Sequence, residues 1–285
     1  MANSNKRDRE GGQNLALVYV STADRDEARR TLRRPGASII SGGTLLLRRL
    51  NEGDTSLETI VRYRDASQRA IETRGGTVRV GAAVTMAEIA ARPDLGGLAC
   101  AAREVGGPAV RAAATVGGNL FAPFPFGDLI PVLLVLEAEI ETLEGEIIPL
   151  RQFTAERAQF SLDRRIVVAV RFDRIEGTRE LYRKVTRVRP HGAPVLVVAS
   201  WSRMVGGVIE DIRVAAGALG LVAQRLRDVE RRLVGIAPTA QAIAEATADI
   251  AEIDPLSDAI ASAWYRRKVL PVHLGRLLSG LGEQA

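Results

Sequence analysis

The stretch "ATVGGNLFAPFPFGDLIPVLL", residues 114–134, joins an adjacent glycine pair, an asparagine and a single acid to an otherwise apolar sequence. Glycine lacks a Cβ atom and accepts positive φ, so Gly117 and Gly118 favour either a tight turn or a close approach of the backbone to a ligand. Asp128 has two interpretations as well: a helix cap or ion-pair partner, or an acceptor for ligand hydroxyls. The stretch alone leaves both questions open.

Length and composition set the first limits on the fold. The chain has 285 residues, 46% of them hydrophobic, and this length favours two domains over one. Residues 1–14 are polar and charged, so we expect a disordered N-terminal lead and no signal peptide. No apolar run reaches the roughly 20 residues that a membrane span needs, and we expect a cytoplasmic protein without a transmembrane segment.

Composition also limits the chemistry of this chain. Its one cysteine, Cys100, excludes a disulfide framework and a cysteine-ligated metal or iron–sulfur site, and with two histidines we assign no metal ligands. A net charge of +5 suggests nucleic acid as a partner, but the arginines are spread along the chain among 34 acids. Aromatic residues are 4% of the sequence and supply few stacking surfaces, so we expect no nucleic-acid partner.

The N-terminal part reads as a small βαβ unit. An apolar run at residues 15–20 predicts a strand, and "STADRDEARRTLRR" predicts a helix with Ser21 or Thr22 as its N-cap. "ASIISGG" predicts a second strand that ends at Gly42 and Gly43, and "SLETIVRYRD" predicts a third. The glycine pair would then lie at the carboxyl end of a strand, where α/β sheets commonly receive ligands.

The rest of the chain alternates between antiparallel strands and helices. Residues 69–85 predict a hairpin that turns at Gly75-Gly76, residues 86–106 an interrupted helix, and residues 128–153 an apolar helix followed by a hairpin at Glu144-Gly145. "DRRIVVAVRF" predicts a further strand. After the charged stretch "DRIEGTRE", three strand patterns precede three amphipathic helices, which predicts a smaller α+β unit.

Two glycine motifs have the same chemistry. "SGGTLL" (residues 41–46) and "TVGGN" (residues 115–119) each place a hydroxyl residue beside two adjacent glycines. Successive N–H groups in a glycine turn bind phosphate well, so two such loops could hold a dinucleotide pyrophosphate from opposite sides. Either pair alone is typical of an ordinary tight turn, and neither motif is a Rossmann fingerprint or a P-loop.

Taken together, four segments resemble one family in their order and spacing. They are "SIISGGTLLLRRL", "TVRVGAAVTMAEIA", "AATVGGNLFAPFPFGDLIPVLLVLEAEIE" and "WYRRKVLPVHLGRLL". The family is the FAD-binding medium subunit of the molybdenum hydroxylases, which include xanthine dehydrogenase and aerobic carbon monoxide dehydrogenase. The resemblance implies an α+β fold: a two-part FAD-binding domain over residues 15–175, with an α/β subdomain (15–60) and an antiparallel-sheet subdomain (61–175), followed by an α+β C-terminal domain (176–285).

The resemblance also implies which residues would bind FAD. The pyrophosphate would lie between the two glycine motifs, Asp128 would face the ribityl and sugar hydroxyls, Val105 and Val167 would line the flavin or adenine, and Lys184 would lie near the isoalloxazine or be a surface lysine. The implied cofactor-binding residues are Ile39, Ile40, Ser41, Gly42, Gly43, Thr44, Leu45, Leu46, Val105, Thr115, Val116, Gly117, Gly118, Asn119, Asp128, Val167 and Lys184. The sequence departs from the family pattern at Leu45 and at "HGAP" (191–194).

The implied function is electron transfer in a heteromeric enzyme. A large partner subunit would carry the molybdenum cofactor and a small one two [2Fe-2S] clusters, from which electrons would reach FAD in this chain and then an external acceptor. The family suggests a dimer of heterotrimers, and no catalytic residue acting on the organic substrate is assigned here. Two rival hypotheses are a stand-alone FAD-dependent oxidoreductase with its own substrate pocket and a non-enzymatic nucleotide-binding or assembly subunit. The sequence identifies neither the organic substrate nor the electron acceptor.

Overall fold

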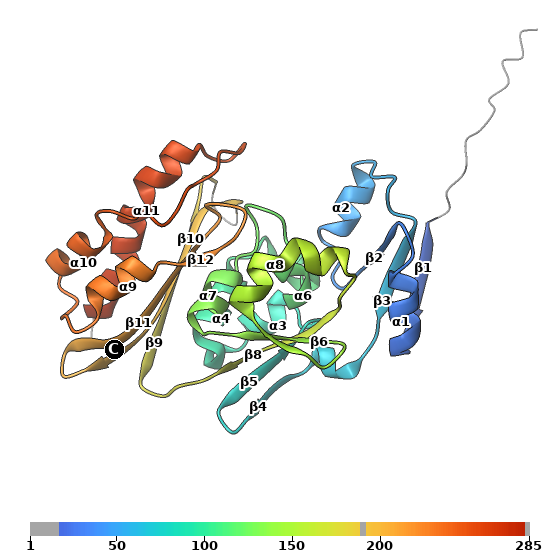
Figure 1. Cartoon of the computed structure of the whole chain (residues 1–285), viewed down its shortest axis with the longest axis horizontal. Helices are drawn as coiled ribbons and strands as arrows, with labels where there is room; N and C mark the ends of the chain where they lie inside the picture. The colour runs from blue at the N-terminus through green and yellow to red at the C-terminus, as the bar shows by residue number, and fades with distance from the viewer. Residues whose placement is uncertain (1–16, 189–191, 283–285) are drawn as a thin grey trace, which may run out of the picture.

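A computed structural model describes residues 17–188 and 192–282. The expected disordered lead at 1–14 lies outside the described residues. Three sheets follow one another across the molecule: a small parallel sheet from the N-terminal part, a central five-stranded sheet, and a four-stranded sheet near the C-terminus (Figure 1). In the described part of the chain, no helix combines the length and apolarity needed to cross a bilayer.

The N-terminal sheet is parallel, as the strand–helix–strand pattern predicts. Its elements are β1 (Val18–Thr22), α1 (Arg25–Leu32), β2 (Ala37–Ile39), α2 (Leu46–Asn51) and β3 (Thr59–Tyr63). The order is β1-β3-β2, so the third strand enters between the first two. Helix α1 covers one face because its Ala28 and Leu32 pack on Val61 of the central strand. The carboxyl ends of all three strands therefore meet at one edge.

The start of α1 differs from the prediction. Ser21 and Thr22 are part of β1 and pair with β3, so neither of them caps the helix. Asp24 is the N-cap, and its carboxylate accepts hydrogen bonds from the N–H groups of Asp26 and Glu27 at 2.7 and 3.1 Å. The sheet requires extended backbone through Thr22, which moves the helix start two residues along the chain.

The central unit surrounds an antiparallel sheet of order β4-β5-β8-β6-β7. Its elements are η1 (Ala66–Arg69), β4 (Ile71–Arg74), β5 (Thr77–Gly81), α3 (Met86–Ala90), η2 (Pro93–Leu95), α4 (Gly96–Arg103), α5 (Pro108–Ala113), α6 (Val116–Leu120), α7 (Ile130–Val135), β6 (Glu139–Thr142), β7 (Ile147–Pro149), α8 (Leu150–Leu162) and β8 (Val167–Asp173). The hairpins at Gly75-Gly76 and Glu144-Gly145 are confirmed. The apolar helix α7 is buried along its whole length in the main core cluster.

Two parts of this unit were not foreseen. The motif "TVGGN" is no open loop: Thr115 caps α6, and the glycines occupy the first turn of that helix. Residues 150–162 form the helix α8, where the sequence patterns predict no helix. Only Leu150, Phe153, Thr154 and Phe160 of α8 are buried, so the helix shows no strong apolar stripe to identify it.

The C-terminal unit contains the three strands and three helices that the sequence predicts, plus a two-residue strand. Its elements are β9 (Thr178–Thr186), β10 (Pro194–Val205), β11 (Val208–Gly217), β12 (Gln224–Arg225), α9 (Arg227–Leu233), α10 (Ala240–Thr247), α11 (Ala263–Leu278) and η3 (Ser279–Gly282). Strand β10 is buried on both faces: Leu196 and Val198 join the cluster under α9–α11, whereas Ala199 and Trp201 join the central core. Because side chains alternate between the two faces of a strand, this sheet packs on the central unit with one face and on α9–α11 with the other (Figure 1).

Candidate functional site

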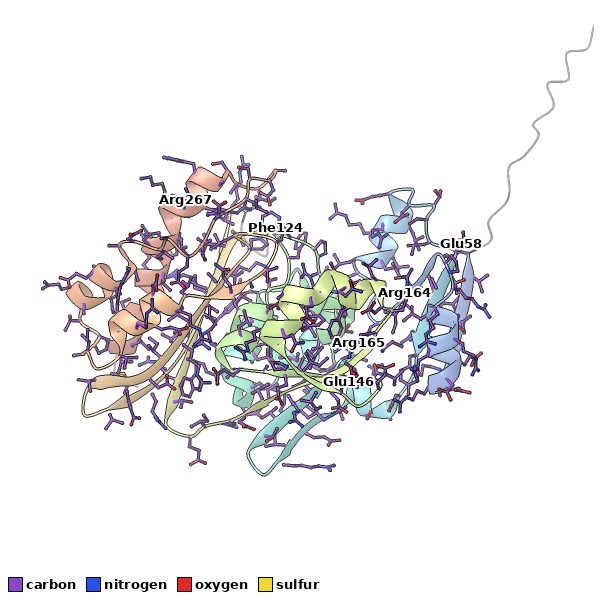
Figure 2. The ribbon with its side chains drawn as sticks, viewed as in Figure 1. Glu58, Phe124, Glu146, Arg164, Arg165 and Arg267 are labelled. Atoms are coloured by element: carbon purple, nitrogen blue, oxygen red, sulfur yellow. The ribbon has the colours of Figure 1, made fainter. Side chains whose placement is uncertain are left out.

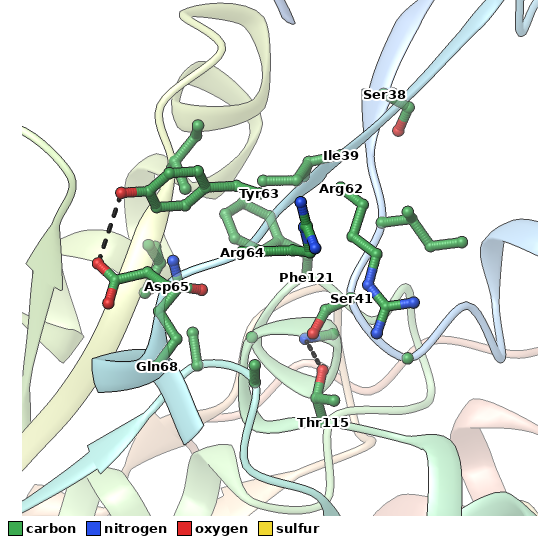
Figure 3. A pocket seen from close by; sticks show the side chains of 18 of the residues that line it. Ser38, Ile39, Ser41, Arg62, Tyr63, Arg64, Asp65, Gln68, Thr115 and Phe121 are labelled. Atoms are coloured by element: carbon green, nitrogen blue, oxygen red, sulfur yellow. Dashed lines mark hydrogen bonds between the residues drawn. The ribbon is translucent and has the colours of Figure 1, made fainter. Parts of the chain in front are cut away.

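A cavity of about 830 Å³ lies between the N-terminal sheet and the central unit. Three groups of residues line it: the ends of β2 and β3, the segment around the second glycine motif, and the connection from α8 to β8 (Figure 3). Its lining includes Ser38, Ile39, Ile40, Ser41, Gly42, Arg49, Arg62, Tyr63, Arg64, Asp65, Gln68, Arg69, Ala82, Ala83, Thr85, Ala112, Ala113, Thr115, Gly117, Gly118, Phe121, Arg164, Arg165, Ile166 and Val167. The two glycine motifs, about 75 residues apart in the sequence, therefore both contribute residues to this lining.

The first glycine motif leaves the sheet where β2 ends. Ile40 still donates its N–H to the Val61 carbonyl at 2.8 Å, and the chain then turns away through Gly42 and Gly43. A Cβ atom at Gly42 would lie 1.9 Å from the Ala113 carbonyl oxygen, and Gly43 has a φ of +74°. Both positions require glycine, Gly42 for space and Gly43 for its backbone conformation.

The backbone donors of this motif are free. In the described part of the chain, the N–H groups of residues 41–44 have no hydrogen-bond partner. Gly42 belongs to the lining of the large cavity, and Gly43 and Thr44 line a shallower hollow that adjoins it through Gly42. Unpaired N–H groups in a glycine turn form a site for an anion.

The second glycine motif differs in its backbone donors. Val116 and Gly117 donate to the carbonyls of Val84 and Ala82 at 3.0 and 2.8 Å, and the Gly118 N–H donates to the Thr115 hydroxyl at 3.2 Å. These N–H groups are therefore already paired, and Figure 3 draws the bond to the Thr115 hydroxyl. A Cβ at Gly117 would lie 3.2 Å from Ala82, so this motif contributes a close-packed floor to the cavity.

Several polar residues of the cavity were missed at the sequence level. Arg62, Arg64 and Asp65 lie at the end of β3, and Gln68 follows in η1. The Nε2 atom of Gln68 is buried without a hydrogen-bond partner in the described residues, as expected of a donor that awaits a ligand. Hydrogen bonds from Ser67 hold the pKa of the Asp65 carboxyl below its usual value. These residues could have been found from the third predicted strand. In a parallel sheet its carboxyl end lies at the same edge as the first glycine motif.

The predicted site residues separate into two groups. Those on the large cavity or the adjoining hollow are Ile39, Ile40, Ser41, Gly42, Gly43, Thr44, Thr115, Gly117, Gly118 and Val167. Those outside both linings are Leu45, Leu46, Val105, Val116, Asn119, Asp128 and Lys184. Val105 and Val116 belong to the central core cluster. The side-chain amide oxygen of Asn119, Oδ1, accepts the Leu129 N–H at 3.0 Å and so fixes the backbone just before α7.

Asp128 and Lys184 lie together in a buried ion pair. Their side chains are 5% and 3% exposed, and Nζ lies 2.9 Å from Oδ2. Burial raises the pKa of the Asp128 carboxyl, an effect that Lys184 opposes. The other carboxylate oxygen, Oδ1, and the Tyr182 hydroxyl are buried without partners in the described residues. Lys184 and Tyr182 line a separate cavity of about 650 Å³, which also contains Cys100.

The large cavity suits a dinucleotide. It joins free backbone donors, arginines, an ionised carboxylate and an unpaired amide donor in one elongated space between two sheets. Phosphates prefer such N–H groups and arginines, and a carboxylate is a common partner of ribose hydroxyls. Residues 189–191, at the start of the "HGAP" segment, lie outside the described residues.

Comparison with known proteins gives the relatives of this chain. Residues 13–172 match the FAD binding domain in molybdopterin dehydrogenase, and residues 180–281 match the CO dehydrogenase flavoprotein C-terminal domain. The glyceraldehyde dehydrogenase medium chain of Sulfolobus acidocaldarius is 28% identical over 178 residues, which are 60% of this chain and 63% of that relative. The aligned region thus spans less than two thirds of the relative.

Solved structures share the fold. The carbon monoxide dehydrogenase of Hydrogenophaga pseudoflava matches with a TM-score of 0.82 at 24% identity, over 92% of this chain and 96% of that one. Quinoline 2-oxidoreductase from Pseudomonas putida 86 matches with a TM-score of 0.83 at 21% identity, over 94% and 99%. The two family models together span most of the chain, and the first alone covers more than half of it, so the chain belongs to the family described as the FAD binding domain in molybdopterin dehydrogenase.

Proposed function

We propose that this chain is the FAD-carrying electron-transfer subunit of a heteromeric molybdenum hydroxylase. It would accept electrons from [2Fe-2S] clusters of a small partner subunit and pass them to an external acceptor, while a large subunit carries the molybdenum cofactor. The observation that carries the proposal is the first glycine motif: the N–H groups of residues 41–44 have no partner in the described part of the chain, and Ser41 and Gly42 line the same cavity as Gly117 and Gly118. We propose a cytoplasmic complex, a dimer of heterotrimers.

The chain's own residues would bind and orient the cofactor. Residues 41–44 would hold the pyrophosphate, and Gln68 and Asp65 offer a donor and an acceptor to the nucleoside half. Bound FAD would supply the redox chemistry, because it exchanges electrons with both one-electron and two-electron partners. The chain contains one cysteine, so clusters held by four cysteines must come from another chain.

The proposed domain bounds are 15–175 and 176–285, with the first divided near residue 60. Chain segments 15–60 and 61–175 would enclose the nucleotide between them. The division near 175 agrees with the gap between β8, which ends at Asp173, and β9, which begins at Thr178. Both core clusters nevertheless include residues of β10, so the two parts share buried side chains across this boundary.

Purification with neighbouring subunits tests the function. We expect a yellow complex with flavin absorption bands, a cysteine-rich small chain and a large molybdenum-containing chain. Gly117→Val and Gly118→Val should abolish FAD retention, because each adds a branched side chain to the cavity floor. Gly107→Ala is the matched control, since a Cβ there meets no atom within 4 Å.

The outcomes separate the rival hypotheses. A colourless chain that takes up no FAD would leave only a nucleotide-binding or assembly role. A flavoprotein that is reduced by an organic substrate without partner subunits would identify a stand-alone oxidoreductase. Retention of full flavin in both valine variants would contradict the assignment of the glycine floor.

A further inference from the structure

The cavity contains far more positive than negative charge. Six arginines line it, and Asp65 is the one acid among its described lining residues. Four of the six arginines are engaged by the protein: Arg49 with Asp54, Arg69 with Glu88, Arg165 with Glu146, and Arg164 with the Ala37 carbonyl. Figure 2 shows Arg164 and Arg165 between α8 and the N-terminal sheet.

The two remaining arginines are Arg62 and Arg64. Within the described residues, neither guanidinium has a hydrogen bond or an ion pair, and both line the cavity. A guanidinium has five N–H donors in a rigid fork and stays charged at every physiological pH. Two such groups with no ion-pair partner among the described residues, at the edge of a ligand cavity, point to an anionic ligand.

Their backbone is fixed close to the first glycine motif. Arg62 follows Val61, the last residue of β3 that pairs with β2, and β2 continues through Ile40 directly into the glycine turn. The Arg64 N–H donates to the Thr22 carbonyl of β1 at 2.8 Å, so the chain on both sides of Arg62 is anchored. In Figure 3 the Arg62 side chain extends from β3 toward the level of Ser41.

The second glycine motif leaves a role for these arginines. A pyrophosphate that contacts the free N–H groups of residues 41–44 has a second side, and there the N–H groups of Val116, Gly117 and Gly118 are already paired. The glycines of α6 therefore leave space for the phosphates but have no free N–H group to donate to them. The donors for that second side must come from side chains.

Resting on the proposed function, we infer that Arg62, assisted by Arg64, is the side-chain clamp of the dinucleotide pyrophosphate. The first glycine motif supplies the backbone donors, and the end of β3 supplies the charge that neutralises the phosphates. Binding is then specific for ligands that contain a diphosphate, and it weakens with added salt.

Titration of the full-length chain, freed of flavin, tests this inference with FAD, ADP and riboflavin as separate probes. Arg62→Gln should weaken binding of FAD and ADP by about 10- to 100-fold, which corresponds to a hydrogen bond between charged groups. Arg64→Gln should weaken it less, and Arg62→Lys should restore part of the loss. Riboflavin binding should be unchanged, because riboflavin has no phosphate. The dependence of the FAD Kd on salt should also become less steep in Arg62→Gln.

Arg33→Gln is the matched control, because Arg33 is an exposed arginine of the same unit outside the cavity lining. Unchanged FAD and ADP binding in the Arg62→Gln, Arg64→Gln double variant would overturn the inference, as would an equal loss of FAD and riboflavin. If the wild-type chain binds ADP through Arg62 but no FAD, the inference stands and the proposed function fails. If it binds FAD with no contribution from Arg62, the reverse holds.

Discussion

The ammonium group of Lys184 lies 2.9 Å from a carboxylate oxygen of Asp128, although the two residues are 56 positions apart in the sequence. Lys184 belongs to β9, and Asp128 lies just before α7. Lys184 also donates to the Glu104 carbonyl at 2.9 Å, at the end of α4. The ion pair thus ties β9 to the segment before α7 and to α4. Asp128 is thus a structural partner inside the protein, and it lies outside the linings of the three cavities described above.

Breaking this pair should cost stability in a pH-dependent way. Asp128→Ala leaves the Lys184 ammonium buried without a counter-ion, and we expect a loss of about 3–5 kcal/mol in the free energy of unfolding. Lys184→Met leaves the Asp128 carboxyl, whose pKa burial raises. A carboxyl with a raised folded-state pKa favours folding at low pH and loses that contribution as pH rises, so the deficit of Lys184→Met should shrink between pH 8 and pH 5.

Urea unfolding at both pH values measures this, with Arg48→Ala as control. Arg48 and Glu52 form an exposed pair one helical turn apart, which should contribute little to stability. If Asp128→Ala proved as harmless as Arg48→Ala, the buried pair would have no structural role.

Gly42→Ala should distort the cavity wall at the first glycine motif. The added Cβ would lie 1.9 Å from the Ala113 carbonyl oxygen, which belongs to the backbone and cannot swing away. We expect a loss of about 1–3 kcal/mol in stability and weaker FAD binding, because the cavity wall must shift. Thermal unfolding and FAD titration measure the two effects.

Gly107→Ala provides the comparison, since its Cβ would have no neighbour within 4 Å, and a loss below about 1 kcal/mol is expected for this N-cap position. Equal behaviour of the two alanine variants would show that Gly42 has no steric requirement.

Arg266→Lys should strongly destabilise the folded chain. Its guanidinium is fully buried and donates to the carbonyls of Val195, Leu256 and Ala261 and to the Asp258 carboxylate. An ammonium group cannot reproduce this planar set of donors, so Arg266→Lys leaves buried carbonyls unpaired. We expect a loss of about 3 kcal/mol or more in unfolding free energy.

The neighbouring Arg267→Lys tests the contrast, because Arg267 is 62% exposed and pairs with an Asp254 that is 93% exposed. Less than about 1 kcal/mol should be lost there. A small effect for both variants in denaturant titrations would argue against Arg266 as the anchor of residues 254–262.

His273 should make the C-terminal unit sensitive to mild acid. Burial, with smaller contributions from Arg183 and Arg276, lowers the pKa of His273 in the folded chain. The unfolded chain then binds the proton more readily, with a pKa near 6.5, so stability falls as pH drops through that value. His273→Gln should flatten the dependence of Tm on pH between 7.5 and 5.5. An identical pH profile in the variant would contradict the assignment.

Local sequence patterns predicted many of the elements. The parallel N-terminal strands, both hairpins of the central sheet and the strands and helices of the C-terminal unit follow from periodicity and turn residues. Helix α8 was missed because few of its residues are buried, and the N-cap of α1 was misplaced because pairing with β3 extends β1 through Thr22. At the start of α1, strand pairing outweighed the local capping signal.

The sequence by itself determined that two glycine motifs follow strand and helix signals in an order typical of one flavoprotein family. Their backbone freedom is local, because it depends on the absence of a side chain. Only the tertiary structure decided what each motif offers: free N–H groups at residues 41–44, but paired ones at 116–118, two of which donate to Val84 and Ala82, more than thirty residues away. It also brought Arg62 beside the first motif and buried Asp128 against Lys184. Hydrogen-bond pairing and burial depend on neighbours that are distant in sequence, and no local pattern specifies them.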